Sequence, residues 1–171
     1  FWFSARLKKA ALSLATGATL AEFPEECLRQ EFAGSRILLV DDEPINREIA
    51  QSILEDVGLV IDTAADGIEA VALASGNDYA GILMDMQMPR LDGLEATRQI
   101  RALPEGQAIP IIAMTANAFA EDRQRCMDSG MSDFLAKPID PERLYATLLS
   151  WLRATEPKSL NGQFTWSERY S

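Results

Sequence analysis

A carboxylate closes a short apolar run near the middle of the chain. Residues 82–84 read Ile-Leu-Met, Asp85 follows them, and Pro89 stiffens the turn beyond. An apolar run of this length, bounded by turn residues, is typical of a strand buried on both faces of a parallel sheet. Ligands of such sheets bind just beyond the carboxyl ends of the strands, so Asp85 is the first candidate for chemistry.

Three other predicted strands also end in polar residues. Asp41 and Asp42 follow the first strand, Thr115 the fourth and Lys137 the fifth. Each residue alone has an ordinary interpretation, because an Asp can cap the next helix, a Thr can form a turn and a Lys can simply be solvated. Strand ends of a parallel sheet share one rim, however, so the combination predicts a shared site.

The residue types at this rim suit phosphoryl chemistry. Three carboxylates within about 4 Å repel by roughly 4 kcal/mol per pair at an effective dielectric near 20, so they require a cation. Mg²⁺ prefers carboxylate, water and phosphate oxygens, and a lysine adds a second positive charge for a transferring phosphoryl group. Asp85 would then act as a nucleophile and form an acyl phosphate.

The elements that must position these residues alternate regularly between strand and helix. The pattern predicts five strands, at 37–40, 59–63, 80–85, 109–114 and 133–136, and five helices, at 44–57, 67–74, 93–102, 119–129 and 141–153. Right-handed crossovers place such helices on both faces of a parallel sheet. We therefore expect a doubly wound α/β fold.

Composition limits the partners. Residues 36–153 hold 20 acidic and 10 basic residues and so carry the whole net charge of -10, which disfavours nucleic acid and anionic membranes and suits a cation or a basic partner. The chain has no apolar run near the length of a membrane helix. It has no histidine, so any phosphohistidine must belong to another polypeptide or another part of its own. Two distant cysteines without a CxxC pattern argue against zinc and for reduced cytosolic thiols.

Four motifs together resemble the receiver domain of two-component response regulators: DDE at 41–43, MDMQMPRLDG at 84–93, AMTANAF at 113–119 and FLAKPID at 134–140. The resemblance covers about residues 36–153 and is greatest to receivers fused to hybrid sensor histidine kinases. It implies a flavodoxin-like sheet with strand order 2-1-3-4-5 and five helices. It also implies a phosphorelay receiver that takes a phosphoryl group from a phosphohistidine in a Mg²⁺-dependent reaction.

The resemblance assigns the acidic residues and one carbonyl to acceptor and metal. Asp85 corresponds to the phosphoacceptor. Asp41, Asp42, Asp85 and the backbone carbonyl of Gln87 correspond to the ligands of Mg²⁺, with Mn²⁺ as an alternative ion.

The remaining site residues are assigned to the phosphoryl group and to the conformational switch. Thr115 and Lys137 would contact the phosphoryl group, and Phe134 corresponds to the switch aromatic. The peptide bond before Pro138 is expected to be cis.

The flanks favour a hybrid kinase as parent. Residues 1–10 begin Phe-Trp-Phe-Ser-Ala-Arg-Leu, which resembles the last strand of a kinase ATP-binding domain. We expect a linker at 11–35, with a helical turn around 25–31, the receiver at 36–153 and a tail at 154–171 that is too short for a DNA-binding domain.

The implied partner is a histidine kinase core or a histidine phosphotransfer domain, and the implied location is the cytoplasm, with a parent kinase that could be membrane-anchored. This fragment would catalyse only its own phosphorylation and dephosphorylation, would not contact the membrane directly and would not bind nucleic acid. Two other classes stay open: a protein-binding pseudo-receiver that is not phosphorylated, and an aspartate-nucleophile phosphatase. The second normally has an Asp-x-Asp after the first strand, which Asp41-Asp42-Glu43 does not provide.

Overall fold

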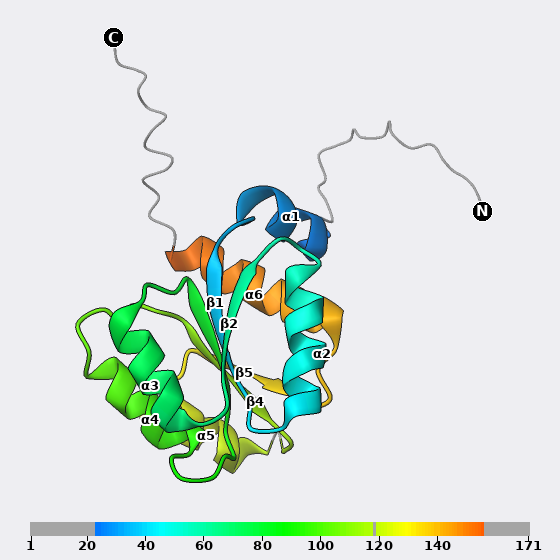
Figure 1. Ribbon diagram of the computed structural model, residues 1–171. Helices are drawn as coiled ribbons and strands as arrows, with labels where there is room; N and C mark the ends of the chain where they lie inside the picture. Colours follow the sequence, from blue (N-terminus) through cyan, green and yellow to red (C-terminus); the bar gives the residue numbers. More distant parts are fainter. Residues whose placement is uncertain (1–22, 118, 156–171) are drawn as a thin grey trace, which may run out of the picture.

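The computed structural model describes residues 23–117 and 119–155, and these form a parallel sheet between two layers of helices (Figure 1). The strands are β1 (Arg36–Val40), β2 (Val60–Ala64), β3 (Gly81–Asp85), β4 (Ile111–Thr115) and β5 (Asp133–Ala136). All neighbouring strands are parallel, in the order β2-β1-β3-β4-β5. The predicted doubly wound fold and strand order are confirmed, with strand bounds within two residues of those expected.

The helices separate into two layers, as Figure 1 shows. One face of the sheet is covered by α3 (Gly67–Gly76), α4 (Gly93–Arg101) and α5 (Ala120–Ser129), and the other by α2 (Pro44–Glu55) and α6 (Pro141–Thr155). Alternate strand residues serve the two cores: Leu38 and Ile82 face the first layer, whereas Leu39 and Leu83 face the second. Burial on both faces explains the continuous apolar strands of the sequence.

One helix lies within the segment that we expected to be a linker. Helix α1 (Pro24–Glu31) buries Leu28 completely and is followed by the buried Phe32, both within the core cluster that contains Leu149 and Leu152 of α6. Its first residue, Pro24, suits a helix start because that position needs no backbone donor. The sequence predicted only a helical turn here, since one fully buried leucine gives a weak periodic signal.

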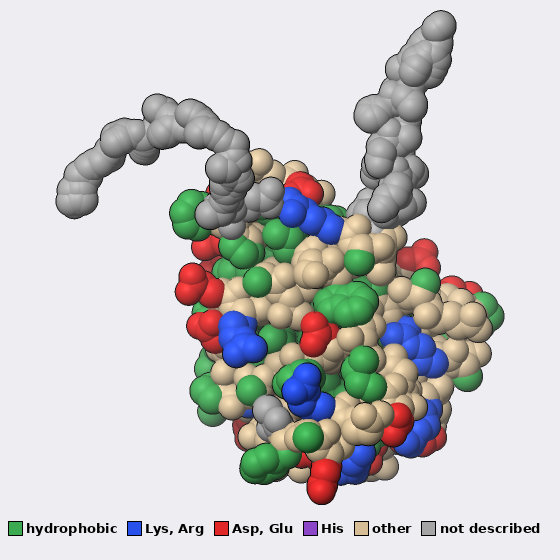
Figure 2. All heavy atoms as spheres, turned by 180° about the vertical axis from the view of Figure 1, so that it is seen from behind, with side chains coloured by type: hydrophobic (Ala, Val, Ile, Leu, Met, Phe, Trp, Pro, Cys, Tyr) green, Lys and Arg blue, Asp and Glu red, His purple; other side chains and the backbone are tan. Residues whose placement is uncertain are grey.

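The surface is mixed in character. On the side opposite to that of Figure 1, hydrophobic, acidic and basic side chains are interspersed (Figure 2). Within the described ranges 23–117 and 119–155, no helix combines the length and the apolar character needed to cross a bilayer.

Candidate functional site

The acidic residues predicted at the strand ends do meet at one rim of the sheet. Asp41 directly follows β1, and Asp85 ends the neighbouring strand β3. Asp41, Asp42 and Asp85 each have a carboxylate oxygen within 4.8 Å of the others. Asp41 and Asp85 are only 2% and 5% exposed, whereas Asp42 is open to solvent. Two poorly hydrated carboxylates and one hydrated carboxylate therefore share a small volume.

Lys137 bridges the two buried carboxylates. Its Nζ lies 3.0 Å from Oδ2 of Asp41 and 3.2 Å from Oδ1 of Asp85. The residue follows β5, whose end is held to β4 by the Lys137 N–H, which donates to the Thr115 carbonyl at 2.8 Å. The Lys137–Pro138 peptide bond is cis. The ammonium compensates part of the negative charge of the site.

Burial dominates the electrostatics of Asp85. Removal from water raises the pKa of Asp85 to about 6; the nearby Lys137 charge opposes this rise and the Asp41 charge adds to it. Burial lowers the pKa of Lys137, but the hydrogen bond to Asp41 and the charge of Asp85 outweigh it, so the pKa lies above its ordinary value. The rim therefore holds a charged lysine and a carboxylate that is costly to ionise without more positive charge.

Backbone contacts fix the two acidic turns. The Glu43 N–H donates to Oδ1 of Asp41 at 2.8 Å, and Arg47 donates to the Asp41 carbonyl at 2.5 Å. The Gln87 N–H donates to Oδ1 of Asp85 at 3.3 Å. Only glycine fits at position 93, because a Cβ there would lie 2.2 Å from the Asp85 carbonyl oxygen. The carboxylates are thus held by short turns that leave little freedom.

The donor set fits a hard divalent cation. Three carboxylate oxygens converge, two of them already freed from most of their water, and one side of the group remains open through Asp42. Carboxylate oxygens with room for water and phosphate oxygens are the environment that Mg²⁺ prefers. Asp41, Asp42 and Asp85 could hold the ion, and Gln87 is adjacent through its contact with Asp85.

Thr115 and Phe134 lie near the site but do not contact its carboxylates. The Thr115 hydroxyl donates to the Asn117 carbonyl at 2.7 Å and accepts from the Asn117 N–H at 3.0 Å. Thr115 lines a cleft of about 480 Å³ together with Asp42 and Gln87. Phe134 is half-buried against the core, and the Arg123 guanidinium lies 4.7 Å from its ring centre. The structure therefore clusters four of the predicted residues and leaves these two outside the cluster; the four are Asp41, Asp42, Asp85 and Lys137.

Two contacts were not foreseen. Arg47 supports the Asp41 turn, and the backbone of Asn117 holds the Thr115 hydroxyl. An arginine in the first turn of a helix and an asparagine after a strand are common surface residues, so the sequence gives no signal for either role.

Comparisons with known proteins agree with this geometry. The family model described as "Response regulator receiver domain" matches residues 37–149. The sensor histidine kinase RcsC of Salmonella typhi is 43% identical over 112 residues, which is 66% of this chain and 12% of that protein. The sensor histidine kinase GacS of Pseudomonas protegens is 34% identical over 149 residues, 85% of this chain and 16% of that protein. The chain therefore spans between about an eighth and about a sixth of the length of these kinases.

One solved structure is similar to this chain in both fold and sequence. It is the receiver domain of the sensor histidine kinase PA1611 from Pseudomonas aeruginosa PAO1, with a TM-score of 0.67 and 45% identity over 71% of this chain and 99% of that one. It is described as having a magnesium ion coordinated in its active site cleft. The chemotaxis protein CheY4 of Vibrio cholerae, with a TM-score of 0.67 and 33% identity over 69% of this chain and 98% of that one, shares the same fold.

Proposed function

This chain belongs to the response regulator receiver domain family, and from that premise we propose that it is a phosphorelay receiver that takes a phosphoryl group from a phosphohistidine onto Asp85. One observation carries the proposal. Three carboxylates lie within 4.8 Å of one another, and Lys137 bridges two of them at the end of the central strands. Like charges at this spacing destabilise the fold, so their collection at one rim favours a functional role over a purely structural one.

The residues suggest how the transfer proceeds. An Oδ of ionised Asp85 attacks the phosphorus, the P–N bond to the donor imidazole breaks, and its electron pair returns to the ring nitrogen, which then takes up a proton. Bound Mg²⁺ would offset the negative charge that develops on the phosphoryl oxygens. We assign its ligands to Asp41, Asp42, Asp85 and the Gln87 carbonyl, and we assign Lys137 and Thr115 to the phosphoryl oxygens. The fragment itself would catalyse only its own phosphorylation and dephosphorylation.

We also propose that the parent is a hybrid sensor histidine kinase, a phosphotransferase that works in the cytoplasm. Sensor kinases are prominent among the similar proteins, and the alignment with GacS covers 149 residues, well beyond the family match at 37–149. The partner would be a histidine kinase core or a histidine phosphotransfer domain. Residues 1–10 would be the end of the kinase ATP-binding domain; this segment lies outside the described residues.

The proposal is tested by incubating the protein with Mg²⁺ and acetyl phosphate and measuring its intact mass. We expect the gain of one phosphoryl group, and no gain when the metal is chelated before the phosphodonor is added, because the crowded carboxylates cannot accommodate an added phosphate without a cation. A pseudo-receiver would gain no mass. A phosphatase acting on external substrates would release phosphate continuously from an unrelated phosphate ester.

Replacing Lys137 with Ala is expected to slow phosphorylation by at least about tenfold, since it removes the ammonium that pairs with Asp41 and Asp85 and would face the phosphoryl group. The rate of mass gain at saturating Mg²⁺ measures this effect. Arg143→Ala removes an exposed positive charge from α6 and serves as the control. Equal rates for wild type and Lys137→Ala would contradict the role given to the ammonium.

Phosphorylation is expected to change hydrogen exchange in α5. If Thr115 moves toward the phosphoryl group and Phe134 follows, α5 must repack, because Arg123 of α5 lies over the Phe134 ring. Only two residues of this helix, Cys126 and Ser129, are buried, so its local stability should be low. Exchange measured with and without beryllium fluoride should therefore differ at 119–129 and stay constant in α3. Identical exchange in both states would count against the switch role of Thr115 and Phe134.

A further inference from the structure

Two loops meet beside the proposed site, and one contact between them has no role in the function described so far. The loop between β2 and α3 carries Asp66, and the loop between β3 and α4, residues 86–92, carries Gln87 and Arg90. Arg90 forms an ion pair with Asp66. We propose that this pair is a positioning device that holds the β3–α4 loop so that Gln87 and Asp85 face the metal; the inference rests on the proposed phosphorylation of Asp85.

Asp66 is a rigid anchor for such a device. Its side chain is buried, with only 4% of its surface exposed, and its Oδ1 accepts from the Glu69 N–H at 2.9 Å as the cap of α3. Glu69 in turn accepts from the Ala65 N–H at 2.7 Å, so the turn is fixed on both sides of Asp66. The second carboxylate oxygen, Oδ2, is the one paired with Arg90.

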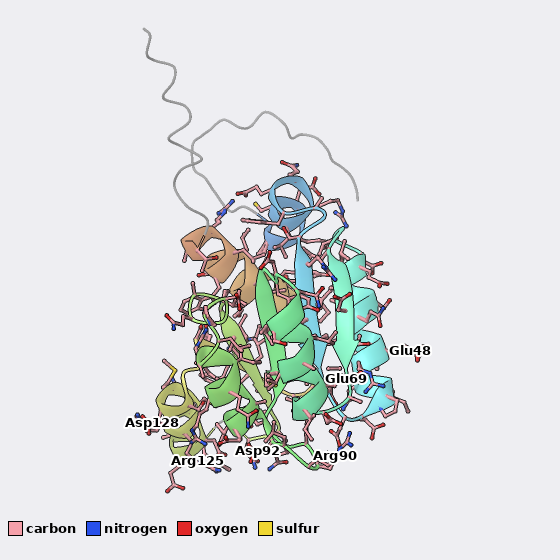
Figure 3. All side chains as sticks on the ribbon, turned by 60° about the vertical axis from the view of Figure 1, so that its left-hand side comes forward. Glu48, Glu69, Arg90, Asp92, Arg125 and Asp128 are labelled. Carbon is pink, nitrogen blue, oxygen red and sulfur yellow. The ribbon has the colours of Figure 1, made fainter. Side chains whose placement is uncertain are left out.

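Arg90 has an unusual backbone conformation. Its φ of 69° makes it the one residue other than glycine with positive φ in the described ranges 23–117 and 119–155. This left-handed region is unfavourable for a residue with a Cβ. Arg90 and Glu69 lie on neighbouring elements at the same rim of the molecule, as Figure 3 shows. The ion pair with Asp66 stabilises the turn at this position.

The two loops also touch through their backbones. A Cβ at Gly67 would lie 2.4 Å from the Leu91 carbonyl oxygen and 3.1 Å from the Ala96 Cβ, so glycine permits the start of α3 to approach the loop closely. The Leu91 N–H donates to the Pro89 carbonyl at 2.8 Å, which keeps the loop tight. Only two residues separate Arg90 from Gln87, so a displacement of the backbone at Arg90 should also displace Gln87.

The ion pair between Arg90 and Asp66 should affect the geometry of the metal site more than the stability of the fold, because Arg90 is exposed to solvent. The Arg90 side chain is 67% exposed, so solvent screens its charge, and Asp66, although buried, keeps its hydrogen bond from the Glu69 N–H when Arg90 is replaced. Removing the pair should therefore change the metal site more than it changes the fold. Residues that orient metal ligands through a second contact commonly affect metal affinity when they are replaced.

The test measures two Mg²⁺ requirements in wild type, Arg90→Gln, Asp66→Asn and the double variant. One is the concentration that gives half-maximal phosphorylation by acetyl phosphate, and the other is the concentration that gives half of the Mg²⁺-dependent rise in melting temperature without a phosphodonor. Asn at position 66 can still accept the helix-capping hydrogen bond but loses the charge. Each single variant should need about three- to tenfold more Mg²⁺. The double variant should need no more than the single variants, because they break the same contact. Arg90→Lys should restore most of the wild-type value.

Arg98→Gln is the matched control, since it removes an exposed arginine from an ion pair with Glu95 on α4 without touching the loop. Its Mg²⁺ requirement and melting temperature should equal those of wild type. An unchanged Mg²⁺ requirement in both single variants would overturn the inference, as would effects that multiply in the double variant. If the wild type itself is not phosphorylated, the proposed function fails and the inference fails with it; a phosphorylated wild type with unaltered variants refutes the inference alone.

Discussion

Asp85→Asn is expected to abolish phosphoryl incorporation, with no mass gain in Mg²⁺ and acetyl phosphate under conditions that fully modify the wild type. Asp85 ends the central strand β3, bonds to Lys137 and lies within reach of both other acids. An amide oxygen at this position is not a nucleophile that can form an acyl phosphate. The substitution changes few atoms and no steric contact, so the fold should persist.

Asp92→Asn is the matched control for this variant. Asp92 lines the cleft that Asp42 and Gln87 also line, and its Oδ1 caps α4 by accepting from the Glu95 N–H at 2.9 Å, a role that asparagine can keep. It should be phosphorylated like the wild type. Full incorporation in Asp85→Asn would show that another carboxylate, such as Asp41 or Asp42, is the acceptor, and would overturn the assignment.

The sequence was sufficient to predict the carboxylate site because its geometry follows from topology. Lys137 and Asp41 are separated by 96 positions, yet each follows a strand, and the carboxyl ends of parallel strands share a rim. The alternation of strands and helices was equally clear in the sequence. Strands buried on both faces are apolar at consecutive positions, whereas strands with one solvated face alternate between apolar and polar residues. The predicted contacts of Asp41, Asp42, Asp85 and Lys137 therefore depended on backbone order alone.

Side-chain orientation and weakly periodic segments could not be predicted in this way. Thr115 lies at the end of a strand as expected, but its hydroxyl donates a hydrogen bond to the Asn117 carbonyl. No pattern in the sequence predicts this side-chain orientation. Helix α1 is attached by Leu28 and by contacts of Arg29 and Glu31 with Asp56 and Arg153, which come from distant parts of the chain. The Arg90–Asp66 pair likewise joins two loops whose approach depends on Gly67.

Mg²⁺ is expected to raise the melting temperature of the wild type. In metal-free buffer, the substitution Asp85→Asn is expected to raise the melting temperature by a smaller amount. A cation that bound only the folded arrangement of Asp41, Asp42 and Asp85 would stabilise that arrangement. Removing one of three mutually repelling charges should add about 1 to 3 kcal/mol to the free energy of unfolding, a figure reduced from the Coulomb estimate because the rim is open to water. This corresponds to roughly 3 to 10 °C.

The difference in melting temperature between Asp85→Asn and metal-free wild type should depend on pH. The pKa of Asp85 is raised by burial to about 6 in the folded protein, above its ordinary value of 3.8. The folded state therefore holds the proton more tightly than the unfolded state, and this contribution to stability is complete below pH 3.8 and lost as pH rises through about 6. Asparagine does not titrate, so the melting temperature of the variant should exceed that of the wild type most above pH 7 and least near pH 4.

Melting curves in chelator and in increasing Mg²⁺, each at several pH values, measure both effects. Asp128→Asn is the control, because Asp128 is an exposed acid on α5 at the outer edge of the molecule in Figure 3 and does not belong to the cluster of three carboxylates. Its removal should not alter the response to Mg²⁺. Mg²⁺ should stabilise the wild type and Asp128→Asn equally, and Asp85→Asn less, since one ligand charge is missing. If metal-free wild type melts no lower than Asp85→Asn above pH 7, and Mg²⁺ shifts neither protein, then the three carboxylates do not share a cation and the assignment of this rim as a metal site is wrong.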